Sequence, residues 1–464
     1  MAYSTINRLI TVFDAALQAL GARVSMPETE RLAMLVHHAM ESKTRAFHTT
    51  GHVFGMCKGM NPRQVLAALF HDLVYFQLDG GFPRDTQNLL GAVTQLEDGA
   101  LILQPYDDGD VPLSLCVALF DFTPGQALPL YGGMNEFLSA VVAARLLQPY
   151  LELPDLIAVV ACIEATIPFR KPDAQGLLAP DRLATRVALQ TRHLFPSNLN
   201  DDGTLHAQIH RVVSDAVQFA NQDVGSFAEA DPGLFLSGTW LLIEESNAPL
   251  AAAGMYTLCE YRCGLTRMDH FLRNLDADSV FHRYQDQPPV QKMETLRSAA
   301  RSNIAFACDF LGAKITSIAI VEALALCTGT DGPVSMFLGD IRSPYGRPER
   351  IEDFLPPATE AKDINGDLLR VLERGRTLES SNDLTASPLT AFMYRCLGDH
   401  GTQYALAAAR QMFDGTRTPL DFLQALDHRM VRAIIRACAR IAVSRSAALQ
   451  TLEQQLGQPP LPVR

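Results

Sequence analysis

Apolar residues recur every three or four positions along most of the chain, and this spacing is typical of amphipathic helices. Ile6, Leu9 and Phe13, for example, share one face of a helix predicted over residues 4–21, which Gly21 ends. A further apolar run predicts a helix over residues 154–167. We find little of the strict alternation that indicates strands. The pattern therefore predicts an all-α protein.

The same pattern suggests how the chain is divided. Its 464 residues are enough for two or three domains or for one large helical body. We expect a helical domain over 1–240, a helical extension packed on it over 241–340, and a C-terminal helical region over 364–464. Several prolines gather in residues 341–363, which predicts a linker there.

Composition narrows the class of protein. Hydrophobic residues make up 48% of the chain, so it can bury a sizeable core, and the formal net charge is −12. This charge argues against broad binding to nucleic acid or to an anionic membrane. The nine cysteines are scattered and form no C-x-x-C pair. No signal peptide is recognised, and no uncharged apolar run reaches the roughly 18 residues of a membrane span. We expect a cytoplasmic protein with reduced cysteines.

Residues 45–75 carry the candidate chemistry. His48 and His52 are four apart, so on a helix they would share one face. His71 and Asp72 follow an apolar helical run, where an imidazole and a carboxylate would be at least partly buried. A single buried histidine is more often a satisfied core residue than a ligand. Two histidines on one face beside a His-Asp pair favour a divalent metal, and imidazole with carboxylate suits Zn, Fe, Mn, Co or Ni, and Mg less well.

This stretch resembles the HD superfamily of metal-dependent phosphohydrolases. The family pattern has a His, then a His-Asp doublet, then a distant Asp, all on helices around one metal; here these would be His52, His71 and Asp72. The segment Phe-His-Thr-Thr-Gly-His is also similar to the first motif of cyclic-nucleotide phosphodiesterases, which makes His48 the candidate general acid. Residues 70–75 are close to a bacterial subgroup of HD hydrolases. The resemblance covers about the first half of the chain and implies an HD-domain helical core with an additional C-terminal helical region.

The distant Asp of the pattern has several candidates. Asp223 follows Asn-Gln and precedes Val-Gly-Ser-Phe, which is similar to the closing segment of the family, and we favour it on that resemblance. Asp215 lies eight residues earlier on the same predicted helix and stays open as the alternative. Asp121 and Asp181 are further candidates.

Three other residues are candidates for the reaction itself. Arg45, three residues before His48, could neutralise phosphate charge, and Arg170 is a second candidate for that task. Glu164 could be a metal ligand or could orient water, but a carboxylate paired with Arg170 or Lys171 on a helix explains it equally well. The HD enzymes with two metals place histidines where this chain reads Ile-Pro-Phe-Arg, so we expect one metal ion per chain.

The sequence thus predicts a metal-dependent phosphohydrolase whose metal-activated water cleaves a phosphomonoester or phosphodiester, with nucleotides among the candidate substrates. We expect a small-molecule partner and neither nucleic acid nor membrane; a homo-oligomer stays open. One alternative is a non-catalytic HD-fold protein that senses a ligand or regulates a partner. Another is an HD-type diiron oxygenase, which would need extra ligands from His193, His206 or His210.

Overall fold

A computed structural model describes residues 4–195, 202–341, 346–378 and 383–456. Within these residues the protein is about 66% helix and 3% strand, which confirms the predicted all-α class. Part of the predicted proline-rich linker, residues 342–345, lies outside the described residues.

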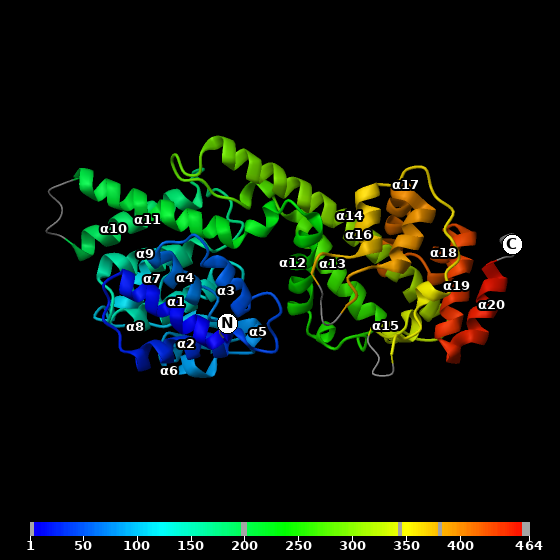
Figure 1. Ribbon diagram of the computed structural model, residues 1–464, viewed down its shortest axis with the longest axis horizontal. Coiled ribbons are helices and arrows are strands. Elements are labelled where there is room, and N and C mark those ends of the chain that lie inside the picture. Colours follow the sequence, from blue (N-terminus) through cyan, green and yellow to red (C-terminus); the bar gives the residue numbers. More distant parts are fainter. Residues whose placement is uncertain (1–3, 196–201, 342–345, 379–382, 457–464) are drawn as a thin grey trace. The chain divides into compact units, whose positions relative to one another are not determined.

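The chain forms two compact units (Figure 1). The first comprises Met1–Ala228 and Asp276–Ala300, and the second comprises Glu229–Leu275 and Arg301–Arg464. Helix α14 (Val290–Thr328) therefore contributes its first eleven residues, 290–300, to the first unit and the rest to the second. The predicted segment boundaries at 240, 340 and 363 stay predictions.

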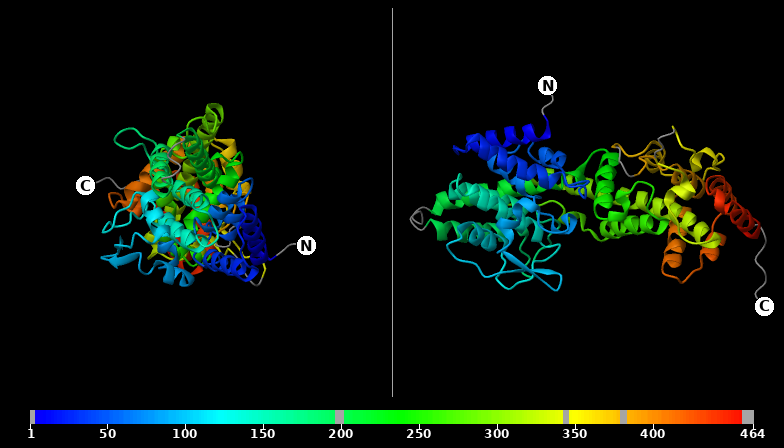
Figure 2. Two further views of the ribbon diagram at one scale, coloured as in Figure 1. Left: turned by 90° about the vertical axis from the view of Figure 1, so that its left-hand side faces the viewer. Right: turned by 90° about the horizontal axis from the view of Figure 1, so that it is seen from below.

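The first unit is a bundle of helices with one small hairpin. Its elements are α1 (Thr5–Ala19), α2 (Met26–Met40), α3 (Thr50–Met56), α4 (Pro62–Phe70), α5 (Phe76–Asp79), α6 (Gln87–Leu90), β1 (Thr94–Glu97), β2 (Ala100–Leu103), α7 (Val111–Phe120), α8 (Met134–Leu147), α9 (Leu153–Ala165), α10 (Ala179–Leu194) and α11 (Asp202–Asp223). Helices α1 and α2 lie side by side, as the dark blue ribbons of Figure 2 show.

Helix α9 lies at the centre of the first unit. Residues 156–165 of this helix are all buried, and it packs against α4, α8 and α11. Its apolar side chains belong to one continuous core shared with those three helices. Because α4 and α11 both rest on α9, the ends of these two helices have fixed positions relative to each other.

The second unit is also helical. Its elements are α12 (Pro232–Glu245), α13 (Leu258–Asn274), the C-terminal part of α14, α15 (Val334–Leu338), α16 (Gly366–Arg374), α17 (Pro388–Phe413), α18 (Pro419–Gln424), α19 (His428–Ile441) and α20 (Ser446–Leu456). Short 3₁₀ turns connect several of them. Helix α14 is long and apolar enough to cross a membrane by length and composition alone, yet 89% of its most apolar window is buried in the structure. A core helix of a folded protein has the same properties.

The hairpin β1–β2 was not predicted from the sequence, in which we find little of the alternation that indicates strands. The two strands are antiparallel and pair Glu97 with Ala100 across the two-residue turn Asp98-Gly99. Both turn residues have positive φ, as this tight turn requires. Asp-Gly is a strong hairpin signal, but the flanking strands are only four residues long and alternate too briefly to be recognised.

The start of helix α4 is stabilised by Asn61, the residue just before it. Asn61 forms a capping box: its side chain accepts hydrogen bonds from the main chain of Arg63 and Gln64, and the Gln64 side chain bonds back to the main chain of Asn61. We expect Asn61→Ala to reduce the free energy of unfolding by about 1–2 kcal/mol, because these main-chain donors lose their acceptor.

Urea unfolding followed by circular dichroism measures this loss. Ser4→Ala is the matched control, because Ser4 precedes α1 without a side-chain cap and its loss should change little. Equal effects of the two substitutions would contradict the role given to the capping box.

Candidate metal centre

Helix α4 delivers His71 and Asp72 into the interior of the first unit. Leu66–Phe70 are buried along the helix, and the helix ends at His71, whose side chain is only 1% exposed. The Asp72 side chain is 15% exposed. This placement is the one that the apolar run before the His-Asp pair predicts.

A hydrogen bond fixes the orientation of the His71 ring. Its Nδ1 lies 2.9 Å from the carbonyl oxygen of Ala68, one turn earlier in α4. A carbonyl can only accept, so Nδ1 carries the proton and donates it. The other ring nitrogen, Nε2, is therefore the atom that His71 offers to its neighbours. Metal-binding histidines are commonly oriented in this way.

Three separate helices bring four side chains together at this point. His52 comes from α3, His71 and Asp72 from the end of α4, and Asp223 is the last residue of α11. His52 Nε2 lies 3.3 Å from His71 Nε2 and 3.1 Å from Asp223 Oδ1. His71 Nε2 lies 2.8 Å from Asp72 Oδ2. The structure thus brings together all four residues predicted as metal ligands.

The donor atoms of His52, His71 and Asp72 all lie within 4.8 Å of one another, which fits a shared cation, and Asp223, outside this group of three, contacts both histidines. Nitrogen and oxygen ligands bound at 2.0–2.2 Å around one ion lie roughly 3.0–3.5 Å from one another. The separations among the four donor atoms that contact one another run from 2.8 to 3.6 Å. The Oδ2 atom of Asp72 is buried, lies 2.8 Å from His71 Nε2 and has no hydrogen-bond partner of good geometry among the described residues. A buried carboxylate oxygen needs a positive partner, and a metal ion is one such partner.

The charges of the four groups depend strongly on one another. Burial disfavours the charged form of His71, but the carboxylates of Asp72 and Asp223 outweigh it and hold the pKa of His71 well above its ordinary value. Burial would likewise raise the pKa of Asp72, yet the neighbouring histidines, His71 first, hold it well below its ordinary range. These charges favour a proton on His71, and a metal ion bound by the same groups would have to displace it.

His48 does not lie on the helix of His52, contrary to the sequence prediction. Helix α3 begins at Thr50, and His48 belongs to the preceding bend. Its ring still lies 5.9 Å from the His52 ring and 4.9 Å from the Tyr75 ring, centroid to centroid. Its charge also contributes to the lowered pKa of Asp72. The bend thus places His48 beside the four donors rather than among them.

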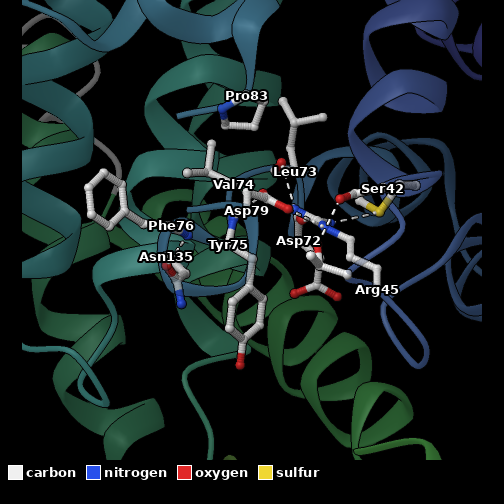
Figure 3. Close-up of polar contacts among 12 residues, drawn as sticks. Ser42, Arg45, Asp72, Leu73, Val74, Tyr75, Phe76, Asp79, Pro83 and Asn135 are labelled. Carbon is white, nitrogen blue, oxygen red and sulfur yellow. Dashed lines mark hydrogen bonds and ion pairs between the residues drawn. The ribbon is translucent and has the colours of Figure 1, made fainter. Parts of the chain in front are cut away.

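Arg45 has a different role from the one that its spacing suggested. Its guanidinium is fully buried and forms an ion pair of 2.7 Å with Asp79. It also donates to the main-chain carbonyls of Asp72 and Leu73, at 2.7 and 3.2 Å (Figure 3). Arg45 therefore holds the chain just after His71 in place. With its donors used in this way, we do not assign it to a substrate phosphate.

Glu164 also forms ion pairs within the protein. Its side chain is 1% exposed, and its carboxylate accepts from Arg170 at 2.5 Å and from Arg186 at 2.7 Å. The pairing with Arg170 is the structural explanation that the sequence left open. We therefore assign Glu164 to the positioning of two arginines rather than to a metal or a water molecule.

Of the four candidate aspartates, Asp223 is the one that contacts both His52 and His71. Asp215 lies elsewhere on α11, where it accepts a 2.9 Å hydrogen bond from the side chain of Asn61 at the start of α4. Asp121 is exposed at the end of α7, and Asp181 lies in the first turn of α10. Neither is among the carboxylates that contact His52 or His71.

Glu136 is a residue near the centre that the sequence did not single out. It lies in the first turn of α8, and its pKa is raised to about 7 by burial, with further contributions from the like charges of Asp72 and Asp223. A carboxyl group that is half protonated at neutral pH can accept or release a proton. The only sequence signal was an acidic residue at the start of an otherwise apolar helix.

The histidines of the diiron alternative do not reach this centre. His206 and His210 lie on α11, 17 and 13 positions before Asp223, which is about 20 Å or more along the helix axis. His210 pairs instead with Asp286 at 3.2 Å. His193 is exposed near the end of α10. These positions do not support a second metal site built from histidines.

Comparisons with known proteins assign no family: no family model, no curated protein and no solved structure matches this chain. The likeness to the HD superfamily therefore rests on the residues themselves.

The candidate metal centre leads to a direct prediction about Asp223 and Asp215, which both lie on α11. We expect Asp223→Ala to lose most of its bound transition metal, because one of four ligands is removed, whereas Asp215→Ala should keep about one ion per chain. Elemental mass spectrometry of the purified variants, after reconstitution with Mn or Co, measures this. Metal retained at wild-type level in Asp223→Ala would remove Asp223 from the ligand set.

Proposed function

We propose that the first unit is an HD-type metal-dependent phosphohydrolase that cleaves a phosphomonoester or phosphodiester. The observation that carries this proposal is the convergence of His52, His71, Asp72 and Asp223, with a buried Asp72 oxygen that has no hydrogen-bond partner of good geometry among the described residues. The four residues occur in the chain in the order of the HD pattern. They supply two nitrogen and two oxygen donors, a set that suits a divalent transition metal.

The proposed roles divide between holding the ion and moving protons. When bound, a divalent ion supplies an activated water and polarises the phosphate. His52, His71, Asp72 and Asp223 would hold that ion, and the bond from His71 to Ala68 keeps its ring in the binding orientation. Arg45 fixes the main chain that carries Asp72.

His48 is the proposed proton donor to the leaving oxygen. It lies next to His52 without belonging to the four-donor cluster, so its proton need not be given up to the metal. The Tyr75 ring lies against it. Glu136, with a pKa near neutrality, is a second group that could accept or hold a proton beside the centre.

A cluster of arginines supports a phosphate-containing substrate. Arg170 and Arg186 share the single carboxylate of Glu164. The Nε atoms of Arg170, Arg186 and Arg297 are buried and have no hydrogen-bond partner among the described residues. Three guanidinium groups with one carboxylate leave an excess of positive charge and unused donors. A phosphate oxygen would satisfy both.

His282 lies close enough to these arginines for their charge to affect its pKa. Its pKa is lowered to about 4, first by burial and then by the charges of Arg170 and Arg297. The side chain of Asn221 forms two hydrogen bonds of 2.8 Å with the main chain of His282. Asn221 lies two residues before Asp223, so the arginine cluster adjoins the end of α11 that carries a proposed ligand.

The proton donor can be tested separately from the metal. We expect His48→Gln to lower kcat for bis-(p-nitrophenyl) phosphate by about 100-fold or more while keeping one metal ion per chain, because general acid catalysis typically contributes that much. Activity is measured with added Mn or Co, alongside metal content. His38→Gln is the control, since His38 is exposed and paired with Asp85 on the surface. Unchanged turnover in His48→Gln would contradict its role.

The arginine cluster predicts an effect on substrate binding. We expect Arg297→Gln to raise KM about tenfold with little change in kcat or metal content, because it removes a charge-assisted contact without breaking an ion pair. Arg31→Gln is the control, since the Arg31 side chain is 53% exposed and pairs with Glu28 on the surface. Equal KM values for the two variants would contradict the proposal that the arginine cluster binds the substrate.

The alternative, a non-catalytic sensor, predicts a different experimental result. A chain that holds one metal ion yet turns over neither phosphomonoesters nor phosphodiesters would favour it over hydrolysis.

A further inference from the structure

The second unit contains a pocket that the proposed hydrolase does not use. Its cavity volume is about 70 Å³, and further space around it is open to solvent. Most of its wall is apolar, and it lies among α13, α14, α15 and the start of α17. Its lining includes Tyr256, Ile318, Val334, Leu338, Leu384 and Leu389. A pocket with an apolar wall suits a ligand with an apolar body.

One end of the pocket is polar and positively charged. Lys314, on α14, lines the pocket although its side chain is only 7% exposed. Its Nζ lies 3.1 Å from Ser387 Oγ and 3.5 Å from Asp383 Oδ2. An ammonium group has three donors, so these two partners leave one unused. Burial and the nearby charge of Arg376 lower the pKa of Lys314 to about 8, although Asp383 acts in the opposite direction.

A second buried cation competes for the same carboxylate. The side chain of Arg376 is fully buried, and its Nη1 lies 3.5 Å from Asp383 Oδ2. None of its three guanidinium nitrogens makes a hydrogen bond among the described residues. Tyr261 also donates to Asp383, at 3.1 Å. One carboxylate therefore serves two cations and a hydroxyl, and the group of Lys314, Arg376 and Asp383 carries an excess positive charge.

Two other carboxylates lie near this end of the pocket. Glu352 lines the pocket but lies 3.9 Å from Arg350, with which it pairs. Glu244 is buried near Tyr256 and has interactions of its own. The ammonium of Lys314 is thus a cation at the end of an apolar pocket, with a donor available.

We propose that this pocket binds a small molecule with an apolar body and one carboxylate group, and that the carboxylate bonds to Lys314. The apolar wall takes the body of the ligand, and the hydroxyl of Ser387 lies beside the ammonium to complete the polar end. A ligand amine would face two cations, and a neutral alcohol would leave the excess charge in place. The proposal concerns the second unit alone and does not depend on the metal centre.

The chain contains a reporter for this site. Trp240 is its one tryptophan. Lys314 Nζ lies 4.7 Å from the centre of the Trp240 ring, and the Arg376 guanidinium stacks on that ring at 4.0 Å. Tryptophan emission responds to nearby charge, so a ligand that engages Lys314 should change the fluorescence of the full-length protein.

The test compares three ligands with the same six-carbon body: hexanoate, hexanol and hexylamine. We expect a saturable change in Trp240 emission with hexanoate, at an affinity about tenfold or more above that of hexanol, because the carboxylate gains a charge-assisted bond. Hexylamine should not bind. Equal affinities for the three ligands, or no saturable change with hexanoate, would overturn the proposal.

Two variants assign the preference to the lysine. Lys314→Met should abolish the preference for hexanoate over hexanol, whereas Lys292→Met, at an exposed position of the same helix, should keep it. If circular dichroism shows that Lys314→Met does not fold, Ser387→Ala provides the second readout. It should weaken hexanoate about threefold or more and leave hexanol unchanged. A preference that survives in the folded variant would overturn the assignment to Lys314.

Discussion

The packing of the first unit directs two imidazole nitrogens at each other. His52 and His71 approach to 3.3 Å through their Nε2 atoms, and His71 cannot turn away because its Nδ1 is bonded to Ala68. Two lone pairs at this distance repel unless a proton or a metal ion lies between them or beside them. Asp72 and Asp223 supply the negative charge that makes either cation favourable. The arrangement is thus satisfied only when something positive occupies it.

The protein carries a net negative charge, but positively charged side chains gather at two buried places. The chain has a formal net charge of −12, yet each unit contains a place where two largely buried cations share one carboxylate. In the first unit, Arg170 and Arg186 share Glu164, while Arg297 adds a further positive charge. In the second, Lys314 and Arg376 share Asp383. Burying charge without a full partner costs stability, so such places are more often kept for binding than for folding. An acidic surface and cationic interiors together favour anions that reach specific pockets over anions that bind anywhere.

Much of the site was readable from the sequence because its signals are local. The capping box at Asn61 and the apolar run after it define α4, and so the position of His71 follows from short-range rules. The partners of these residues were not readable, because they depend on which helices pack together. Asp223 could be preferred to Asp215 only by resemblance, and the fold separates them by pairing Asp215 with Asn61.

The roles of two basic residues could not be predicted either. Arg45 looked available for a substrate because its partner, Asp79, lies 34 residues away in the sequence. Lys314 gave no signal at all, since a lysine in an apolar helix has no motif.

The path of the chain makes the first unit an interrupted domain. Residues 229–275 belong to the second unit, and the chain then returns for 276–300. A fragment that stopped at Ala228 would contain every proposed ligand of the metal, but it would lack the main chain of His282 that braces Asn221 near the end of α11. The unit that carries the proposed metal ligands therefore cannot be separated from the rest of the protein by a single cut in the chain. To obtain it alone, an engineer would have to delete the inserted segment and splice Ala228 to Asp276.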